Sequence, residues 1–236
     1  MVQVFSFCLY NPPNPLYYTG LFENVVMIHK YFPNFHIYIY IGNDVPKQTC
    51  DDLQAYPNVR LYFTGEIGAV NMIHRFFAID EPGVEVMLVR DADSRVHWKD
   101  RWAISQFLAE PTAMVHTIRD APVHTAPIMG GLWGMKKIAG FSIRSMYEEY
   151  KTRVPIEDRW GVDQYFLRLA LYPHVKPVLL IHSSNGWKCE PSEHIVMFPF
   201  AYSREVFCGR NEYGTYAEAK PPIPFRSVLD VIHAPR

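Results

Sequence analysis

The sequence predicts an α/β fold with a mostly parallel central sheet flanked by helices. In the first half of the chain, short runs rich in β-branched and aromatic residues alternate with segments that repeat apolar residues every three or four positions. The resulting order of four strands and three intervening helices is typical of a parallel sheet with helices on both faces. With 236 residues, 49% of them hydrophobic, the chain is long enough to bury a large core.

Each element of the first half follows from its local pattern. The apolar strand at 2–9 must end in the stretch YNPPNP, because three prolines cannot continue a strand. The segment 21–32 carries apolar residues at i, i+4, i+7 and i+11, which predicts a helix. The remaining predictions are a strand at 36–42, a helix at 46–56, a strand at 58–63, a helix around 70–77 and a strand at 84–89.

The second half is less regular. Helices are predicted at 101–110, 143–154 and 161–172, a strand at 113–120, and a strand that runs into a loop at 175–187. The glycine-bearing segment 126–137 receives no element. We expect a single domain over residues 1–213, followed by a proline-rich tail or flap at 214–236.

Charge and cysteine content exclude several classes of protein. The net charge of −1 gives no general attraction to nucleic acid. There is no run of about 18 apolar residues, so no membrane span is expected, and the N-terminus has no basic leader typical of a signal peptide. The four cysteines lack C-x-x-C spacing, which argues against a zinc site and favours reduced thiols in the cytoplasm of a host or bacterial cell.

The strongest functional signal is the stretch RDADSR, directly after the strand at 84–89. Residues i and i+2 of a strand point to one side, so Asp91 and Asp93 either converge on a ligand or bracket a turn. Neighbouring carboxylates repel each other unless a cation or a proton lies between them, and Mg²⁺ or Mn²⁺ binds carboxylates together with substrate phosphates. The alternative is an ordinary turn, with Asp93 or Ser94 capping a helix that begins near Trp98. A position beyond a buried strand favours the ligand, because ligands of such sheets bind at the carboxyl ends of strands.

Four motifs follow one another along the chain: D-x-D-S at 91–94, R-D-x-P-x-H at 119–124, G-G-x-W-G at 130–134 and D-Q at 163–164. In this order they resemble GT-A-fold glycosyltransferases of large DNA viruses, chlorella viruses among them, and of bacterial polysaccharide clusters. The resemblance extends from about Val4 to about Tyr213. It implies a GT-A (Rossmann-like) fold and the metal-dependent transfer of a sugar from a nucleoside diphosphate donor, usually a UDP-sugar, to a glycan hydroxyl.

The resemblance also implies roles for individual residues. Mn²⁺ or Mg²⁺ would be held by Asp93, with Asp91 and a late histidine, His182, as further ligands. Asp163 would bind donor hydroxyls near the anomeric carbon, and Gln164 would face the reaction centre. The donor nucleotide would contact Leu9, Tyr10, Asn11, Tyr17, Arg75, Asp91, Ser183 and Lys188. The sugar or the acceptor would contact Arg119, Asp120, Gly130, Gly131 and Trp133.

Structural alternatives stay open for these residues. His182 can be a loop histidine bonded to the backbone, and Asp163 can stabilise a helix N-terminus. Trp133 and the tyrosines can belong to the core, Arg119 and Asp120 can form a surface ion pair, and Lys188 can face solvent.

Three functions are weighed. The first is the glycosyltransferase, for which we expect retention of the anomeric configuration because the D-Q pair resembles retaining enzymes without an evident general base. The second is a sugar nucleotidyltransferase, which usually carries a glycine-rich loop with a basic residue where this chain has YNPPNP. The third is a non-catalytic module that binds a nucleotide sugar or a carbohydrate.

Overall fold

The computed structural model describes residues 2–11, 13–156 and 161–210. The expected tail at 214–236, and the domain boundary at 213, lie outside these residues. Within them, no helix is both long enough and apolar enough to cross a membrane. All four cysteines are free thiols.

The described residues form an eight-stranded sheet in the order β3-β2-β1-β4-β6-β5-β7-β8. Neighbouring strands are parallel, except that β6 runs antiparallel to β4 and β5. The strands are β1 (Val2–Leu9), β2 (His36–Ile41), β3 (Val59–Phe63), β4 (Val84–Arg90), β5 (Val115–Arg119), β6 (Leu132–Lys136), β7 (Leu179–Ser183) and β8 (His194–Met197). This sheet confirms the predicted class.

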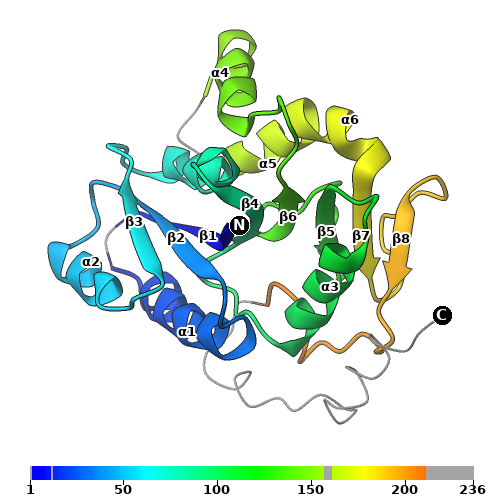
Figure 1. Ribbon diagram of the computed structural model, residues 1–236, viewed down its shortest axis with the longest axis horizontal. Helices are drawn as coiled ribbons and strands as arrows, with labels where there is room; N and C mark the ends of the chain where they lie inside the picture. Colours follow the sequence, from blue (N-terminus) through cyan, green and yellow to red (C-terminus); the bar gives the residue numbers. More distant parts are fainter. Residues whose placement is uncertain (1, 12, 157–160, 211–236) are drawn as a thin grey trace.

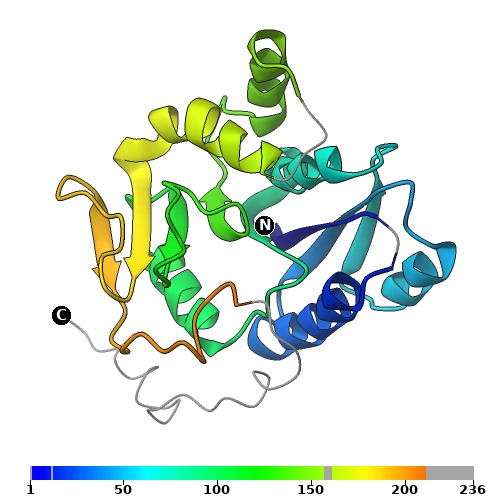
Figure 2. The same ribbon diagram turned by 180° about the vertical axis from the view of Figure 1, so that it is seen from behind.

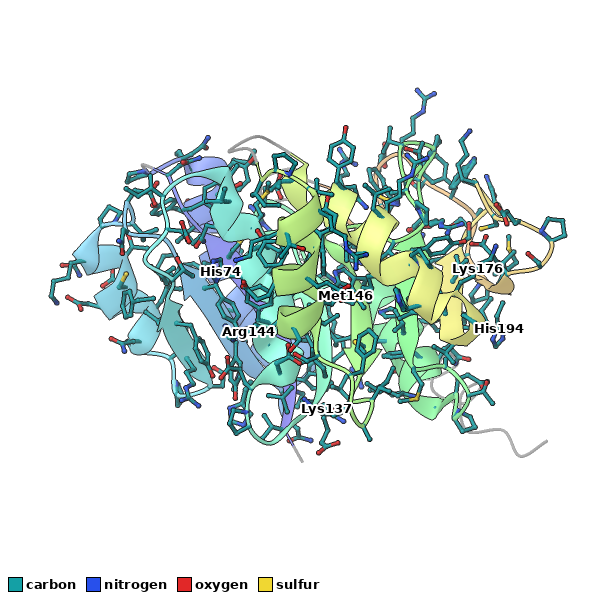
Figure 3. All side chains as sticks on the ribbon, turned by 90° about the horizontal axis from the view of Figure 1, so that it is seen from above. His74, Lys137, Arg144, Met146, Lys176 and His194 are labelled. Atoms are coloured by element: carbon teal, nitrogen blue, oxygen red, sulfur yellow. The ribbon has the colours of Figure 1, made fainter. Side chains whose placement is uncertain are left out.

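Helices cover both faces of the sheet, as Figures 1 and 2 show. One face packs against α1 (Pro15–Tyr31), α2 (Lys47–Gln54) and α3 (Trp98–Ala109). The other packs against the 3₁₀ helix η1 (Ala69–Asp80), α4 (Ile143–Arg153), α5 (Val162–Phe166), the π-helical turn η2 (Leu167–Leu171) and α6 (Tyr172–Val175), with a short turn η3 (Lys176–Val178) before β7. Figure 3 looks onto this second layer, where His74 of η1 and Arg144 of α4 lie.

Strand β1 shows why the central strands are apolar throughout. Its alternate residues Phe5 and Phe7 pack toward α1, whereas Val4 and Cys8 pack toward η1. All four side chains are buried. Burial of one such side chain stabilises the fold by roughly 1.5–3 kcal/mol, so a strand covered on both sides gains from every position.

Several boundaries differ from the sequence prediction. Helix α1 starts at Pro15, earlier than expected, because the Asn14 side chain accepts from the Leu16 backbone N–H at 3.0 Å. Helix α3 starts at Trp98, earlier than the predicted 101, and its N-cap is His97, in a capping box with Asp100, and not Asp93 or Ser94. The strands β6 and β8 were not predicted. Strand β6 lies within the glycine-bearing segment, which carries little strand propensity of its own.

The strand order fixes where a site can form. Strands β1 and β4 are parallel neighbours, so the residues that follow them emerge at one edge of the sheet. Strand β6 runs the opposite way beside β4 and therefore begins at this same edge. Tyr10, Asp91 and Gly131 are thereby brought together from distant parts of the sequence.

Candidate active site

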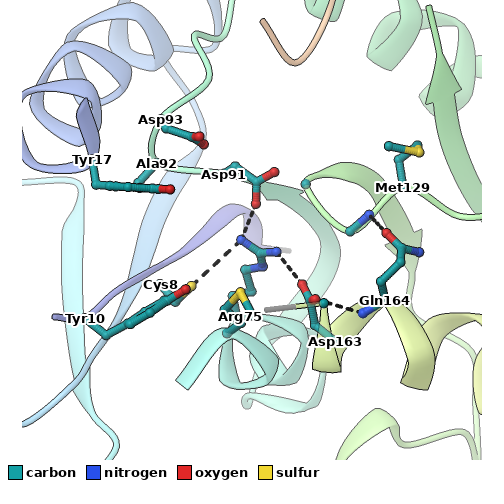
Figure 4. Close-up of a pocket in the computed structure, with 14 residues that line it drawn as sticks. Cys8, Tyr10, Tyr17, Arg75, Asp91, Ala92, Asp93, Met129, Asp163 and Gln164 are labelled. Carbon is teal, nitrogen blue, oxygen red and sulfur yellow. Dashed lines mark hydrogen bonds and ion pairs between the residues drawn. The ribbon is translucent and has the colours of Figure 1, made fainter. Parts of the chain in front are cut away.

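A cavity of about 320 Å³ opens at this edge of the sheet (Figure 4). It is lined by Cys8, Tyr10, Tyr17, Met72, Arg75, Asp91, Ala92, Asp93, Met129, Gly130, Gly131, Gly161, Asp163 and Gln164. Three carboxylates and one guanidinium give these described lining residues a formal charge of −2 when all are ionised. The other side chains of this lining are uncharged at neutral pH, including the phenols of Tyr10 and Tyr17 and the thiol of Cys8, whose pKa values are raised by burial.

Arg75 lies at the centre of the charged groups. Its Nη1 donates to Asp91 Oδ1 at 2.5 Å and its Nη2 donates to Asp163 Oδ2 at 2.7 Å. Burial alone would lower the pKa of the guanidinium, but the carboxylates of Asp91 and Asp163 raise it well above its usual value. Burial raises the pKa of Asp163, and Arg75 opposes that shift. The guanidinium therefore holds both carboxylates in place and is itself only 4% exposed.

Among the described residues, Asp93 is the cavity carboxylate that forms no ion pair with a lysine, arginine or histidine. It follows Asp91 in a turn in which the Ser94 N–H donates to the Asp91 carbonyl at 3.3 Å. Within the described part of the chain, no other side chain donates a hydrogen bond to the Asp93 carboxylate. Burial and the nearby Asp91 raise the pKa of Asp93 to about 6. Two hard oxygen ligands with an unmet negative charge fit a divalent cation such as Mn²⁺ or Mg²⁺.

The glycine pair before β6 lets the backbone approach the acids closely. A Cβ atom on Gly131 would lie 1.9 Å from Asp91 Oδ2, far inside van der Waals contact. A Cβ atom on Gly130 would lie 3.1 Å from Asp163 Oδ2 and 3.3 Å from Gln164 Oε1, which is tight but less severe. Only glycine at 131 leaves Asp91 where it is.

A smaller pocket of about 140 Å³ adjoins the cavity at the end of β1 and shares Cys8, Tyr10 and Tyr17 with it. Leu9, Asn11, Asn14 and Tyr18 complete its lining. Asn11 has a left-handed backbone (φ 66°), and its N–H donates to Asp44 Oδ2 at 2.8 Å. The turn after β1 is therefore fixed by a side chain from the turn that follows β2, and the four expected nucleotide contacts at 9–17 lie together here.

His182 does not line the cavity. Its ring is completely buried among Trp102, His116 and Phe198, at ring-centroid distances of 5.7, 5.6 and 6.0 Å. It lies on the face of the sheet that packs against α3, whereas Arg75 approaches from the opposite face. The structure thus brings Asp91 and Asp93 together but separates His182 from them.

Two more of the expected contact residues act as internal cross-links. Arg119 is 1% exposed and donates to both carboxylate oxygens of Glu193 at 3.1 Å and to the Lys188 carbonyl at 2.6 Å. Asp120 is fully buried, forms an ion pair with Lys99 at 2.8 Å and accepts from the Cys208 N–H at 2.9 Å. These bonds attach the segments around 188–193 and 208 to the sheet.

Ser183 and Trp133 are also internal. The Ser183 hydroxyl donates to the Arg119 carbonyl at 2.8 Å and accepts from the Gly186 N–H at 2.9 Å. The Trp133 ring is fully buried and packs edge-on against Phe76, with ring centroids 5.2 Å apart. Neither side chain lines the cavity, and neither does that of Lys188.

A second group of potential metal ligands lies inside the protein. Ligand atoms of His97, Asp100 and Cys208 are within 4.8 Å of one another. His97 Nδ1 already accepts from the Lys99 N–H at 3.1 Å, and Asp100 forms an ion pair with Arg90 at 2.9 Å. Burial raises the pKa of the Cys208 thiol well above its usual value. These groups are engaged with one another and with buried cations, so the cluster is suited to a structural role.

Several lining residues escaped the sequence analysis. Cys8 precedes Tyr10 by two positions and so faces the same side of β1, a signal that strand periodicity offers. Gly161 is the N-cap of α5 and has a left-handed backbone (φ 83°), a conformation that glycine adopts without steric cost. Met72, Ala92 and Met129 carry no pattern that marks them in advance.

Comparisons with known proteins give fold-level likenesses. No protein-family model and no curated protein matches the chain. It is similar to a glycosyltransferase involved in the glycosylation of the major capsid of PBCV-1, with 18% identity, a TM-score of 0.49, and coverage of 77% of this chain and 81% of that one. It is similar to the mannosyltransferase PcManGT from Pyrobaculum calidifontis, in complex with GDP-Man and Mn²⁺, with 17% identity and a TM-score of 0.45. That match covers 66% of this chain and only 49% of the mannosyltransferase.

A third similar structure belongs to a different class of enzyme. It is the 4-diphosphocytidyl-2C-methyl-D-erythritol synthase from Anaerococcus prevotii, with 12% identity, a TM-score of 0.48, and coverage of 86% of this chain and 94% of that one. All three TM-scores lie below 0.5, so the function proposed for this chain rests on the cavity itself.

Proposed function

We propose that this chain is a glycosyltransferase that moves a sugar from a nucleoside diphosphate donor, UDP-linked in the first instance, to a hydroxyl of a glycan acceptor. The observation that carries the proposal is the pair Asp91 and Asp93 at the carboxyl end of β4. Among the described residues, both line a cavity that also holds a third carboxylate and one cation, which is already neutralised.

The charge of the cavity supports a requirement for a divalent cation. A lining of formal charge −2 would repel a nucleotide diphosphate, which is itself anionic. This charge already includes Arg75, whose guanidinium is bonded to Asp91 and Asp163 and so is not free to bind a phosphate. Asp93, with Asp91 beside it, would hold Mn²⁺ or Mg²⁺, and donor phosphate oxygens would supply further ligands. Such a cation neutralises the charge that grows on the departing diphosphate.

The other residues would orient the donor and its sugar. Tyr10, Asn11 and Tyr17 surround the smaller pocket and would contact the nucleoside. Asp163 is fixed by Arg75 and would accept hydrogen bonds from donor hydroxyls near the anomeric carbon. Positioning of this kind lowers the barrier because the reacting groups need no further search for their geometry.

The same arrangement supports retention of configuration. Asp91 and Asp163 are paired with Arg75, and Asp93 is assigned to the cation, so none of the carboxylates that the described residues contribute to the cavity is left to act as a general base toward the acceptor. The acceptor proton would pass to an oxygen of the departing phosphate, on the face that the leaving group vacates. Proton NMR of the product would show the donor's anomeric configuration, and an inverted product would refute this part of the proposal.

The test of the whole proposal is release of nucleoside diphosphate. The purified chain is incubated with a panel of UDP- and GDP-sugars in Mn²⁺, with and without EDTA. We expect slow release of the diphosphate from one donor, abolished by EDTA and by Asp93→Asn. The matched control is Asp51→Asn, which removes an acid from an exposed ion pair of α2 and should leave release unchanged.

Two outcomes would replace the proposal. Release of pyrophosphate from a nucleoside triphosphate and a sugar phosphate would identify a nucleotidyltransferase. Tight binding of a nucleotide sugar without turnover of any donor would identify a binding module.

A further inference from the structure

The side-chain amide of Gln164 is bonded to backbone at both ends. Its Oε1 accepts from the Gly130 N–H at 3.0 Å, and its Nε2 donates to the Ile128 carbonyl at 2.5 Å. Figure 4 shows Gln164 directed at this loop. The two polar groups of the amide are therefore committed to the chain segment that leads into β6.

This segment determines where Asp91 can lie. Gly131 is the next residue, and its backbone approaches Asp91 so closely that a Cβ atom there would be 1.9 Å from Oδ2. A shift of the loop toward β4 would push the Asp91 carboxylate away, and a shift in the other direction would leave it without support. On its far side the loop is also bonded to the sheet, from the Met129 N–H to Thr117 Oγ1 and from the Leu132 N–H to the Met129 carbonyl, both at 3.0 Å.

Helix α5 reaches Asp91 by a second route. The Gln164 N–H donates to Asp163 Oδ1 at 2.8 Å, and Asp163 is bonded through Arg75 to Asp91. The first turn of α5 thus contacts Asp91 through Arg75 on one side and through the loop 128–131 on the other.

We propose that Gln164 is a positioning residue, which holds the loop 128–131 in register and thereby places Asp91 for the cation. This differs from the expectation that Gln164 acts at the reaction centre. Its consequence for ligand binding rests on the proposed function, whereas the contact between Gln164 and the loop does not.

The variant Gln164→Glu distinguishes positioning of the loop from action at the reaction centre, because the two roles predict opposite dependence on pH. A protonated Glu side chain restores both bonds, because its O–H donates to Ile128 and its carbonyl oxygen accepts from Gly130. An ionised Glu directs a negative oxygen at the Ile128 carbonyl and loses that bond. A positioning role predicts that the variant improves as pH falls. A role as nucleophile or as stabiliser of positive charge predicts that it improves as pH rises.

Calorimetry of UDP binding in Mn²⁺, from pH 5 to pH 8, gives the first readout. Affinities are expressed relative to the native protein at each pH, so that titration of groups common to both cancels. We expect Gln164→Glu to bind about tenfold more weakly at pH 8 and to approach the native affinity at pH 5. Gln164→Met, similar in length but unable to bond the loop, should be weaker at every pH. Native affinity of Gln164→Met, or a Gln164→Glu variant that gains on the native protein as pH rises, would overturn the proposal.

Amide hydrogen exchange gives a second readout that needs no ligand. In the unliganded protein, Gln164→Met should accelerate exchange at Gly130 by tenfold or more, while the amide of Phe5 in β1 stays as protected as before. If the native protein binds no UDP in Mn²⁺, the proposed function fails, and exchange at Gly130 alone then decides whether Gln164 holds the loop. Unchanged exchange at Gly130 in a folded Gln164→Met variant would overturn the inference.

Discussion

Replacing Arg75 by methionine should destabilise the fold strongly. The side chain is 4% exposed, is the only cation among the described residues that line the cavity, and is bonded to Asp163, whose side chain is 7% exposed. Methionine retains much of the volume but leaves Asp163 buried beside no positive charge. Removal of one partner from a buried ion pair costs about 3–5 kcal/mol of unfolding free energy. Asp91 adds little to this figure, because its side chain is 43% exposed and water can solvate it.

Urea unfolding at pH 7, followed by tryptophan fluorescence, measures this cost. Arg153→Met is the control, since its ion pair with Glu149 is 73% and 64% exposed and should contribute less than about 0.5 kcal/mol. Adding Asp163→Asn to Arg75→Met should recover about 1–3 kcal/mol, because the uncompensated charge is then absent. A loss below about 1 kcal/mol in Arg75→Met, or no recovery in the double variant, would refute the reasoning.

Two further predictions concern backbone contact and pH. Gly131→Ala should weaken UDP binding in Mn²⁺ at least tenfold, because its Cβ displaces Asp91. Gly130→Ala should have the smaller effect, because the nearest atoms to its Cβ would be 3.1 Å or more away. Calorimetry that gives Gly130→Ala the larger loss of UDP affinity would contradict the geometry. Burial lowers the pKa of His124 from 6.5 to about 4, and its Nδ1 accepts from the Asp120 N–H at 3.0 Å. Because the pKa of His124 is lower in the folded protein, the neutral imidazole contributes fully to the free energy of unfolding above pH 6.5. That contribution is lost as pH falls toward 4. Between pH 7 and pH 5 this loss is roughly 2 kcal/mol of unfolding free energy. His124→Gln should lack this part of the decline when urea unfolding is measured over the same pH range. An equal decline of unfolding free energy with pH in both proteins would contradict the prediction.

Much of the fold could be predicted because the central strands are buried on both faces. A short apolar run such as 84–89 is typical of a strand that is covered on both faces. The helices between the strands carry clear 3.6-residue periodicity. Strand β6 could not be predicted, because Gly134 lies in it and no alternation marks it. It pairs with β4, which is distant in sequence, as well as with the preceding strand β5, and the pairing that makes it a strand is visible only in three dimensions.

The candidate site was predictable where residues follow a strand directly. Tyr10 and Asp91 follow neighbouring parallel strands, so the order of the strands alone brings them together. His182 and Arg119 are near strand ends too, yet they point into packed layers. Sequence does not reveal which side of a strand end faces a cavity, because that depends on which helix covers it. Likewise, nothing in the motif D-Q shows that the amide of Gln164 is bonded to a loop some 35 residues earlier.

Calorimetry of UDP binding with and without Mn²⁺, on the native chain and on Asp93→Asn, tests the central claim most directly. The account predicts that Mn²⁺ tightens binding of UDP at least tenfold in the native chain, and that the gain disappears when the Asp93 carboxylate becomes an amide. Equal affinity for UDP in Mn²⁺ and in EDTA, or a Mn²⁺-dependent gain that survives in Asp93→Asn, would contradict it.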